Sequence, residues 1–210
     1  MRNSVSPVLP RADIDQAVAA ERHRLADHVA ELTDEQWATQ SLCAAHLTLT
    51  TRITVPRLVR AAIRARGSFD RMEIDLAAER AAAYSTAELV AQLRESAGST
   101  RRTPGSSPTD PLMDLVVHAQ DIARPLGRRY VSPPGVVAAC LAYVATNKFM
   151  GGPRRLSGVR LVSTDTGCSL GEGTELRGAD IDLLLVAAGR PAALAALDGP
   201  GAAIVAERLS

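Results

Sequence analysis

The hydrophobic pattern of this 210-residue chain changes period at Gly151-Gly152-Pro153. Before that point apolar side chains recur at helical spacing, as they do between Asp13 and Leu32. After it, residues 158–165 alternate apolar and polar side chains, and residues 168–177 can pair back on them as a second strand. Because one element cannot satisfy both periods, the change predicts two domains of different class.

We therefore expect a mainly α protein, in which residues 1–150 form a helical bundle and residues 154–210 a small α/β domain. Thr33 and Gln36 can form a capping box, which predicts that a short helix begins there. Further helices are predicted over residues 47–66, where Pro56 should kink or restart the helix, and over residues 87–97, 110–124 and 133–148.

The composition is that of an ordinary globular protein and excludes several functions. A formal net charge of +1 gives no support for a nucleic-acid partner, and no stretch approaches the roughly 20 apolar residues that cross a membrane. Lys148 is the only lysine among 24 basic residues, which indicates a GC-rich bacterial genome. Cys43, Cys140 and Cys168 form no CxxC pair, so we expect reduced thiols in a cytoplasmic protein.

Asp114, His118 and Asp121 are the residues that most directly indicate chemistry. Their spacing of i, i+4 and i+7 places all three on one face of the helix predicted over residues 110–124. Such a face can present two metal ligands one turn apart, with the second carboxylate orienting the imidazole. An Asp and a His four residues apart also form ordinary surface or capping pairs, and that alternative stays open at this point.

Two segments resemble a known family. Thr33-Asp34-Glu35-Gln36-Trp37, followed by Ser41-Leu42-Cys43-Ala44-Ala45, is similar to the LTxxQW and SLCAGW segment of mycothiol-dependent maleylpyruvate isomerases. Residues 117–123 (VHAQDIA) resemble the VHxxDIA segment of the same family. The resemblance implies a DinB-like four-helix bundle followed by a small α/β domain reminiscent of sterol carrier proteins.

The resemblance also implies a divalent metal, usually zinc, and identifies its ligands. Two of them correspond to Asp114, where the family usually has Glu, and to His118. The third, a histidine on the second helix, corresponds by counting from Cys43 to Thr54, and a threonine hydroxyl is a weak ligand for zinc. We therefore expect a degenerate site that holds zinc weakly, and we expect Thr54→His to raise its affinity at least tenfold.

Three other residues are alternatives for the missing ligand. His28 would need the right helix rotation, and Asp121 would need to move from orienting His118 to binding the metal. His46 lies two turns before Thr54, about 12 Å along the axis of a continuous helix, so it could replace Thr54 only if the helix is broken.

The family's activity implies mycothiol, a small-molecule thiol, as a partner of the site together with an electrophilic substrate. Arg177 or Arg190 is the candidate for binding a substrate carboxylate. The basic residues Arg101, Arg102, Arg128 and Arg129 are candidates for binding an anionic thiol cofactor. The alternative function is a non-catalytic bundle that binds a small ligand or a partner, which Thr54 favours. A homodimer is compatible with either function.

Overall fold

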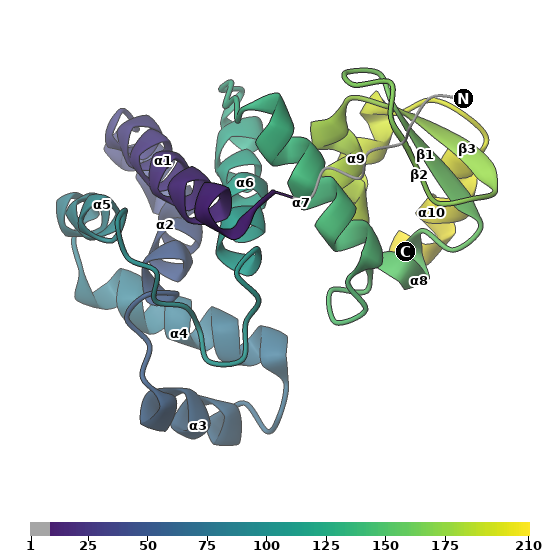
Figure 1. The fold of residues 1–210 in the computed structure, drawn as a ribbon. Coiled ribbons are helices and arrows are strands. Elements are labelled where there is room, and N and C mark those ends of the chain that lie inside the picture. The colour runs from purple at the N-terminus through teal and green to yellow at the C-terminus, as the bar shows by residue number, and fades with distance from the viewer. Residues whose placement is uncertain (1–8) are drawn as a thin grey trace. The chain divides into compact units, whose positions relative to one another are not determined.

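The computed structural model describes residues 9–210 and divides the chain into two compact units (Figure 1). The helical unit spans Arg11–Tyr130. It contains α1 (Arg11–Ala30), α2 (Asp34–Leu49), α3 (Val55–Arg64), α4 (Phe69–Ala83), α5 (Thr86–Glu95), α6 (Asp110–Ala123) and the short 3-10 helix η1 (Arg124–Leu126).

Helix α2 is the centre of the helical unit. It packs on α4, α5 and α6, while α1 packs on α5 and α6. The predicted capping box at its start is confirmed, because the Thr33 hydroxyl accepts from the amide of Gln36 and the Gln36 side chain accepts from the amide of Thr33. At the other end α2 stops at Leu49, and α3 begins afresh at Val55 with Pro56 in its first turn. The helix predicted over residues 47–66 is therefore two helices with a break between them.

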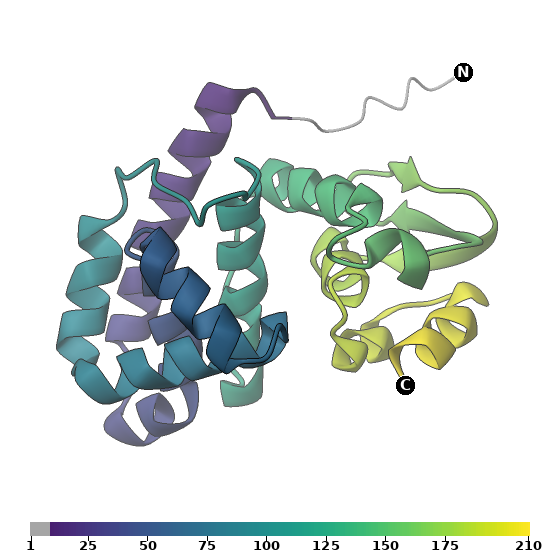
Figure 2. The same cartoon turned by 90° about the horizontal axis from the view of Figure 1, so that it is seen from below.

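Helix α4 is not among the helices predicted from the apolar periods, although it has an N-cap: the Ser68 hydroxyl accepts from the amide of Arg71. Figures 1 and 2 show α3 on the outer side of α4. The two helices enclose a small apolar cluster that also includes the end of α2, formed by Leu49, Ile53, Ala61, Ala65, Met72 and Leu76. This cluster fixes α4 beside the second half of α2.

A buried arginine joins three of these helices. Arg80 of α4 is 4% exposed. Its guanidinium donates to the Thr48 hydroxyl on α2 and to the Gln92 side chain on α5, and it lies over the ring of Tyr84. Since a buried guanidinium is stable only when its donors are satisfied, these bonds fix α2 and α5 against α4.

The C-terminal unit spans Val131–Ser210 and is the small α/β part of the protein. It contains α7 (Pro134–Thr146), α8 (Gly152–Arg155), β1 (Val159–Ser163), β2 (Ser169–Leu170), β3 (Thr174–Gly178), α9 (Asp180–Ala187), the 3-10 helix η2 (Pro191–Ala196) and α10 (Gly201–Leu209). The division falls between Tyr130 and Val131, earlier than the expected boundary at residues 151–153. The reason is that α7 packs on α9 and so belongs with the residues that follow it.

The sheet of this unit differs from the predicted hairpin. Strand β1 pairs antiparallel with the two-residue β2 and parallel with β3, so the strand order is β2-β1-β3. The chain therefore crosses from one edge of β1 to the other between Leu170 and Thr174. Gly173 permits this crossing: it has a φ of +117°, and a Cβ there would lie 2.2 Å from the carbonyl oxygen of Gly158.

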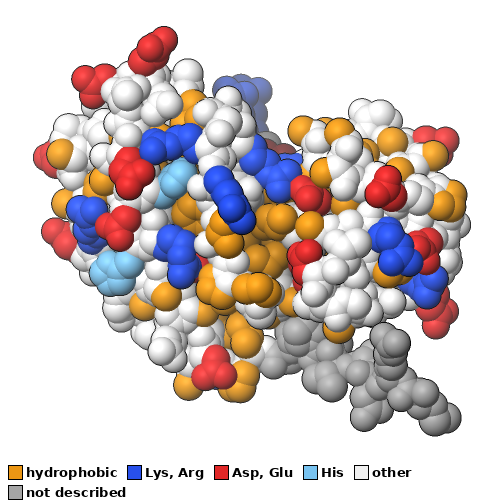
Figure 3. Space-filling model, turned by 90° about the horizontal axis from the view of Figure 1, so that it is seen from above, with side chains coloured by type: hydrophobic (Ala, Val, Ile, Leu, Met, Phe, Trp, Pro, Cys, Tyr) orange, Lys and Arg blue, Asp and Glu red, His pale blue; other side chains and the backbone are white. Residues whose placement is uncertain are grey.

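Acidic and basic side chains are both spread over the surface seen in Figure 3. Within residues 9–210, none of the helices combines the length and the apolar character that a membrane span requires.

The bonds of Arg80 generate the first prediction. Arg80→Ala should lower the free energy of unfolding by about 2–4 kcal/mol, because it leaves a cavity and removes the buried guanidinium that bonds to Thr48 and Gln92. Arg71→Ala on the same helix is the matched control; Arg71 is exposed, and its loss should cost less than about 0.5 kcal/mol. Urea unfolding of both variants measures the difference, and equal effects would contradict the role given to Arg80.

Candidate metal and thiol site

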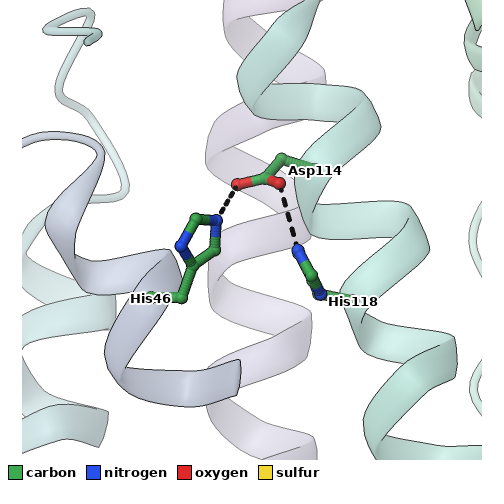
Figure 4. Close-up of side chains that lie close together, drawn as sticks. All are labelled: His46, Asp114 and His118. Carbon is green, nitrogen blue, oxygen red and sulfur yellow. Dashed lines mark ion pairs between the residues drawn. The ribbon is translucent and has the colours of Figure 1, made fainter. Parts of the chain in front are cut away.

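Asp114 lies between two histidines that come from different helices. One carboxylate oxygen is 3.3 Å from Nε2 of His118, one turn later on α6, and the other is 3.3 Å from Nε2 of His46 on α2 (Figure 4). The two imidazole rings meet edge to face, with their centroids 5.0 Å apart. One ligand atom from each of the three residues can be chosen so that all three lie within 4.8 Å of one another.

The three side chains are largely shielded from water: those of His46, Asp114 and His118 are 16%, 20% and 21% exposed. Asp121 is a second neighbour of His118, with its Oδ2 3.0 Å from Nδ1 of the ring. Asp121 therefore lies where the sequence predicts an orienting carboxylate, on the far side of the His118 ring from Asp114.

Mutual attraction dominates the electrostatics of this cluster. Burial opposes the charged form of His118, but the Asp114 carboxylate outweighs burial and holds the pKa of His118 well above its ordinary value. The pKa of His46 is raised by the same balance of burial against Asp114. Burial also opposes ionisation of Asp114, yet the two imidazoles hold its pKa well below the usual range for a carboxyl.

A pocket of about 230 Å³ opens beside the cluster. Its lining residues all belong to the helical unit, and they are Leu42, Cys43, His46, Asp70, Glu73, Ile74, Ala77 and His118. His118 thus faces a pocket. Cys43 is half-buried and lines the same pocket, rather than lying in the core as its residue type suggests. The pocket is large enough for part of a small molecule beside the histidines.

Thr54 does not take part in this arrangement, in contrast to the expectation from counting along the sequence. It is the exposed N-cap residue of α3, beyond the break that follows Leu49. His46 occupies the position beside Asp114 and His118 instead. The condition under which His46 could replace Thr54, a broken helix, is met, because α2 and α3 are separate helices.

The other candidates have different surroundings. His28 on α1 packs edge to face against Tyr130, with the ring centroids 5.3 Å apart, and His23 is exposed. In the C-terminal unit, Arg177 pairs with the neighbouring Glu175, and Arg190 donates to the carbonyl of Ala188.

Sequence reasoning missed Asp70 and Glu73, the two carboxylates that line the pocket. Both lie on α4, which the apolar periods did not predict. A signal for this helix is nevertheless present in the sequence: Ser68 is a standard N-cap residue, and Met72, Leu76 and Arg80 follow at helical spacing on a face that is buried.

Comparisons with known proteins agree with this fold. A sequence model described as the mycothiol maleylpyruvate isomerase N-terminal domain matches residues 18–111, and the match ends three residues before Asp114. The crystal structure of the mycothiol-dependent maleylpyruvate isomerase is similar, with a TM-score of 0.54 and 14% sequence identity over 87% of this chain and 90% of that one. A comparison with curated proteins gives no match.

The pKa shifts predict how stability depends on pH in the metal-free protein. The raised pKa values of His46 and His118 contribute stability that is complete below pH 6.5 and is lost as the pH rises through them. The lowered pKa of Asp114 contributes stability that is present above pH 3.8 and is lost at still lower pH. We therefore expect the free energy of unfolding in chelator to decline from pH 6.5 upward.

The measurement is the free energy of unfolding in urea, compared between wild type and His118→Gln from pH 6 to pH 9. The free energy of unfolding of wild type should fall toward that of the variant as the pH rises, because His118 loses its proton over this range and glutamine does not titrate. Parallel pH profiles for the two proteins would show that the attraction between His118 and Asp114 does not stabilise the fold.

Proposed function

Because residues 18–111 match the model of the mycothiol maleylpyruvate isomerase N-terminal domain, we propose that this protein is a metal-assisted, thiol-dependent isomerase or thiol transferase. The thiol is mycothiol or a related small-molecule thiol, and the other partner is an unsaturated electrophile. The observation that carries the proposal is the cluster of His46, Asp114 and His118 beside a pocket.

The donor set of this cluster fits a divalent metal. Two imidazole nitrogens and a carboxylate oxygen are ligands that zinc prefers, and catalytic zinc sites combine three protein ligands with one open position. Two of the three donor residues, His46 and His118, also line the pocket, so a small molecule in the pocket can reach a metal bound by them. A cation would have to displace protons from His46 and His118, whose pKa values are raised. Binding of the cation should therefore become stronger as the pH rises.

A bound divalent cation would supply one function, the lowering of the pKa of a thiol so that thiolate is present at neutral pH. The chain's own residues prepare the site for that function. Asp121 lies against Nδ1 of His118 and holds the ring so that Nε2 faces Asp114 and His46. Leu42, Ile74 and Ala77 give the pocket an apolar wall against which an electrophile can pack.

Addition and elimination of the thiol account for isomerisation without any further reagent. The sulfur adds to one carbon of the double bond, and a proton is taken up at the other. The bond is then single and can rotate, and loss of the proton and the thiol restores the double bond in the other geometry. A transferase would stop after the addition. The non-catalytic alternative depended on Thr54 as a missing ligand, and with His46 beside Asp114 and His118 that argument no longer favours it.

Zinc titration tests the proposal directly. Chelator-treated wild type should bind one zinc ion, and His46→Ala or His118→Ala should each weaken binding at least tenfold, about 1.4 kcal/mol, because each removes one of three ligands. His28→Ala, a change at a histidine of the same unit that packs on Tyr130, is the matched control and should bind as wild type does.

Thr54→His distinguishes this site from the one expected from the sequence. With His46 as the third ligand, the substitution should change zinc affinity by no more than about twofold, since Thr54 is an exposed N-cap residue. A tenfold gain in Thr54→His together with no loss in His46→Ala would overturn the assignment of His46.

A further inference from the structure

The pocket beside the histidine cluster combines an apolar wall with carboxylates. Asp70 and Glu73 line it together with Leu42, Ile74 and Ala77. Asp70 is exposed and Glu73 is half-buried, so the first lies at the surface and the second lies deeper. Asp114 adds a third carboxylate, in contact with both histidines of the pocket.

Within the helical unit that the structure describes, no lysine or arginine lines the pocket to balance these charges. Burial raises the pKa of Glu73; the imidazoles of His46 and His118 oppose this shift, and the carboxylates of Asp114 and Asp70 add to it. A divalent cation at the histidine cluster would neutralise two of the three carboxylates. The pocket would then still carry a net negative charge when its histidines are neutral.

We infer that this pocket takes an uncharged, largely apolar electrophile and excludes dicarboxylates, with Asp70 and Glu73 as the residues that set this specificity. The inference rests on the proposed function for the reaction, and on the lining of the pocket for the substrate class. Carboxylates of a substrate would lie close to those of Asp70 and Glu73 in a partly buried site, where like charges repel more strongly than in water. An ester, amide or ketone has no such cost and packs on Leu42, Ile74 and Ala77.

Cys43 reports on the charge of the pocket without requiring catalysis. Iodoacetamide and iodoacetate have similar size and react alike: the sulfur displaces iodide and forms a carbon–sulfur bond. One reagent is neutral and the other is an anion. Both reagents react with the same thiolate, so the thiolate fraction does not affect the ratio of their rates at one cysteine. That ratio therefore measures the electrostatic potential at the thiol. Cys168 is exposed in the C-terminal unit and provides the reference ratio in the same molecule.

The experiment uses zinc-treated protein at pH 8 and low salt, and peptide mass spectrometry follows each cysteine. We expect the ratio of the iodoacetamide rate to the iodoacetate rate to be at least about fivefold greater at Cys43 than at Cys168. Glu73→Gln and Asp70→Asn should each lower the rate ratio at Cys43 toward the ratio at Cys168. Asp75→Asn removes the same charge from the exposed, ion-paired part of α4 and is the matched control, which should leave the ratio unchanged.

Equal ratios at Cys43 and Cys168, or a preference of Cys43 for iodoacetate, would overturn the inference. A second measurement follows thiol-dependent cis–trans isomerisation of dimethyl maleate and of the maleate dianion. Turnover of the diester alone supports the inference, and preferred turnover of the dianion overturns it. If neither turns over while the excess at Cys43 depends on Glu73, the substrate class stands and the proposed reaction fails.

Discussion

The carboxylate of Asp114 is the interaction on which the site depends, because it is the contact point of two helices that are far apart in the sequence. It meets His118 one turn along α6 and His46 on α2. A partly buried carboxylate in a mainly apolar bundle is costly unless it is paired, and two imidazoles supply the pairing. The same arrangement places three metal-binding atoms together. The same cluster therefore serves as an ion pair in the metal-free protein and, in the function proposed above, would hold the metal.

The place where α2 ends determines whether His46 can reach Asp114. Thr48, Thr50, Thr51 and Thr54 are β-branched residues with low helix propensity, and the helix stops at Leu49 within this run. Arg80 then fixes the last turn of α2 through Thr48, and the apolar cluster around Leu49 and Met72 holds α4 beside it. These contacts bring Glu73 and Asp70 of α4 to the pocket that His46 lines.

Much of the fold is readable from the sequence, since capping residues and apolar periods are local signals. The start of α2 at Thr33, the helix that carries Asp114 and His118, and the α/β character of the chain after Gly151 follow from such signals. The position of His46 beside Asp114 and His118 could not be found in the same way. Counting along a matching segment assumes that the helix continues, whereas α2 stops at Leu49, before Thr54 is reached. The parallel pairing of β3 is also a tertiary property, because it depends on the contact of Gly173 with the distant carbonyl of Gly158.

The central claim is that His46, and not Thr54, completes the metal site with Asp114 and His118. Anomalous diffraction at the zinc edge from crystals soaked in zinc locates the ion without reference to activity. The account predicts one strong peak in contact with His46, Asp114 and His118. A peak bound by Asp114 and His118 with His46 turned away, or a peak beside Thr54, would contradict it.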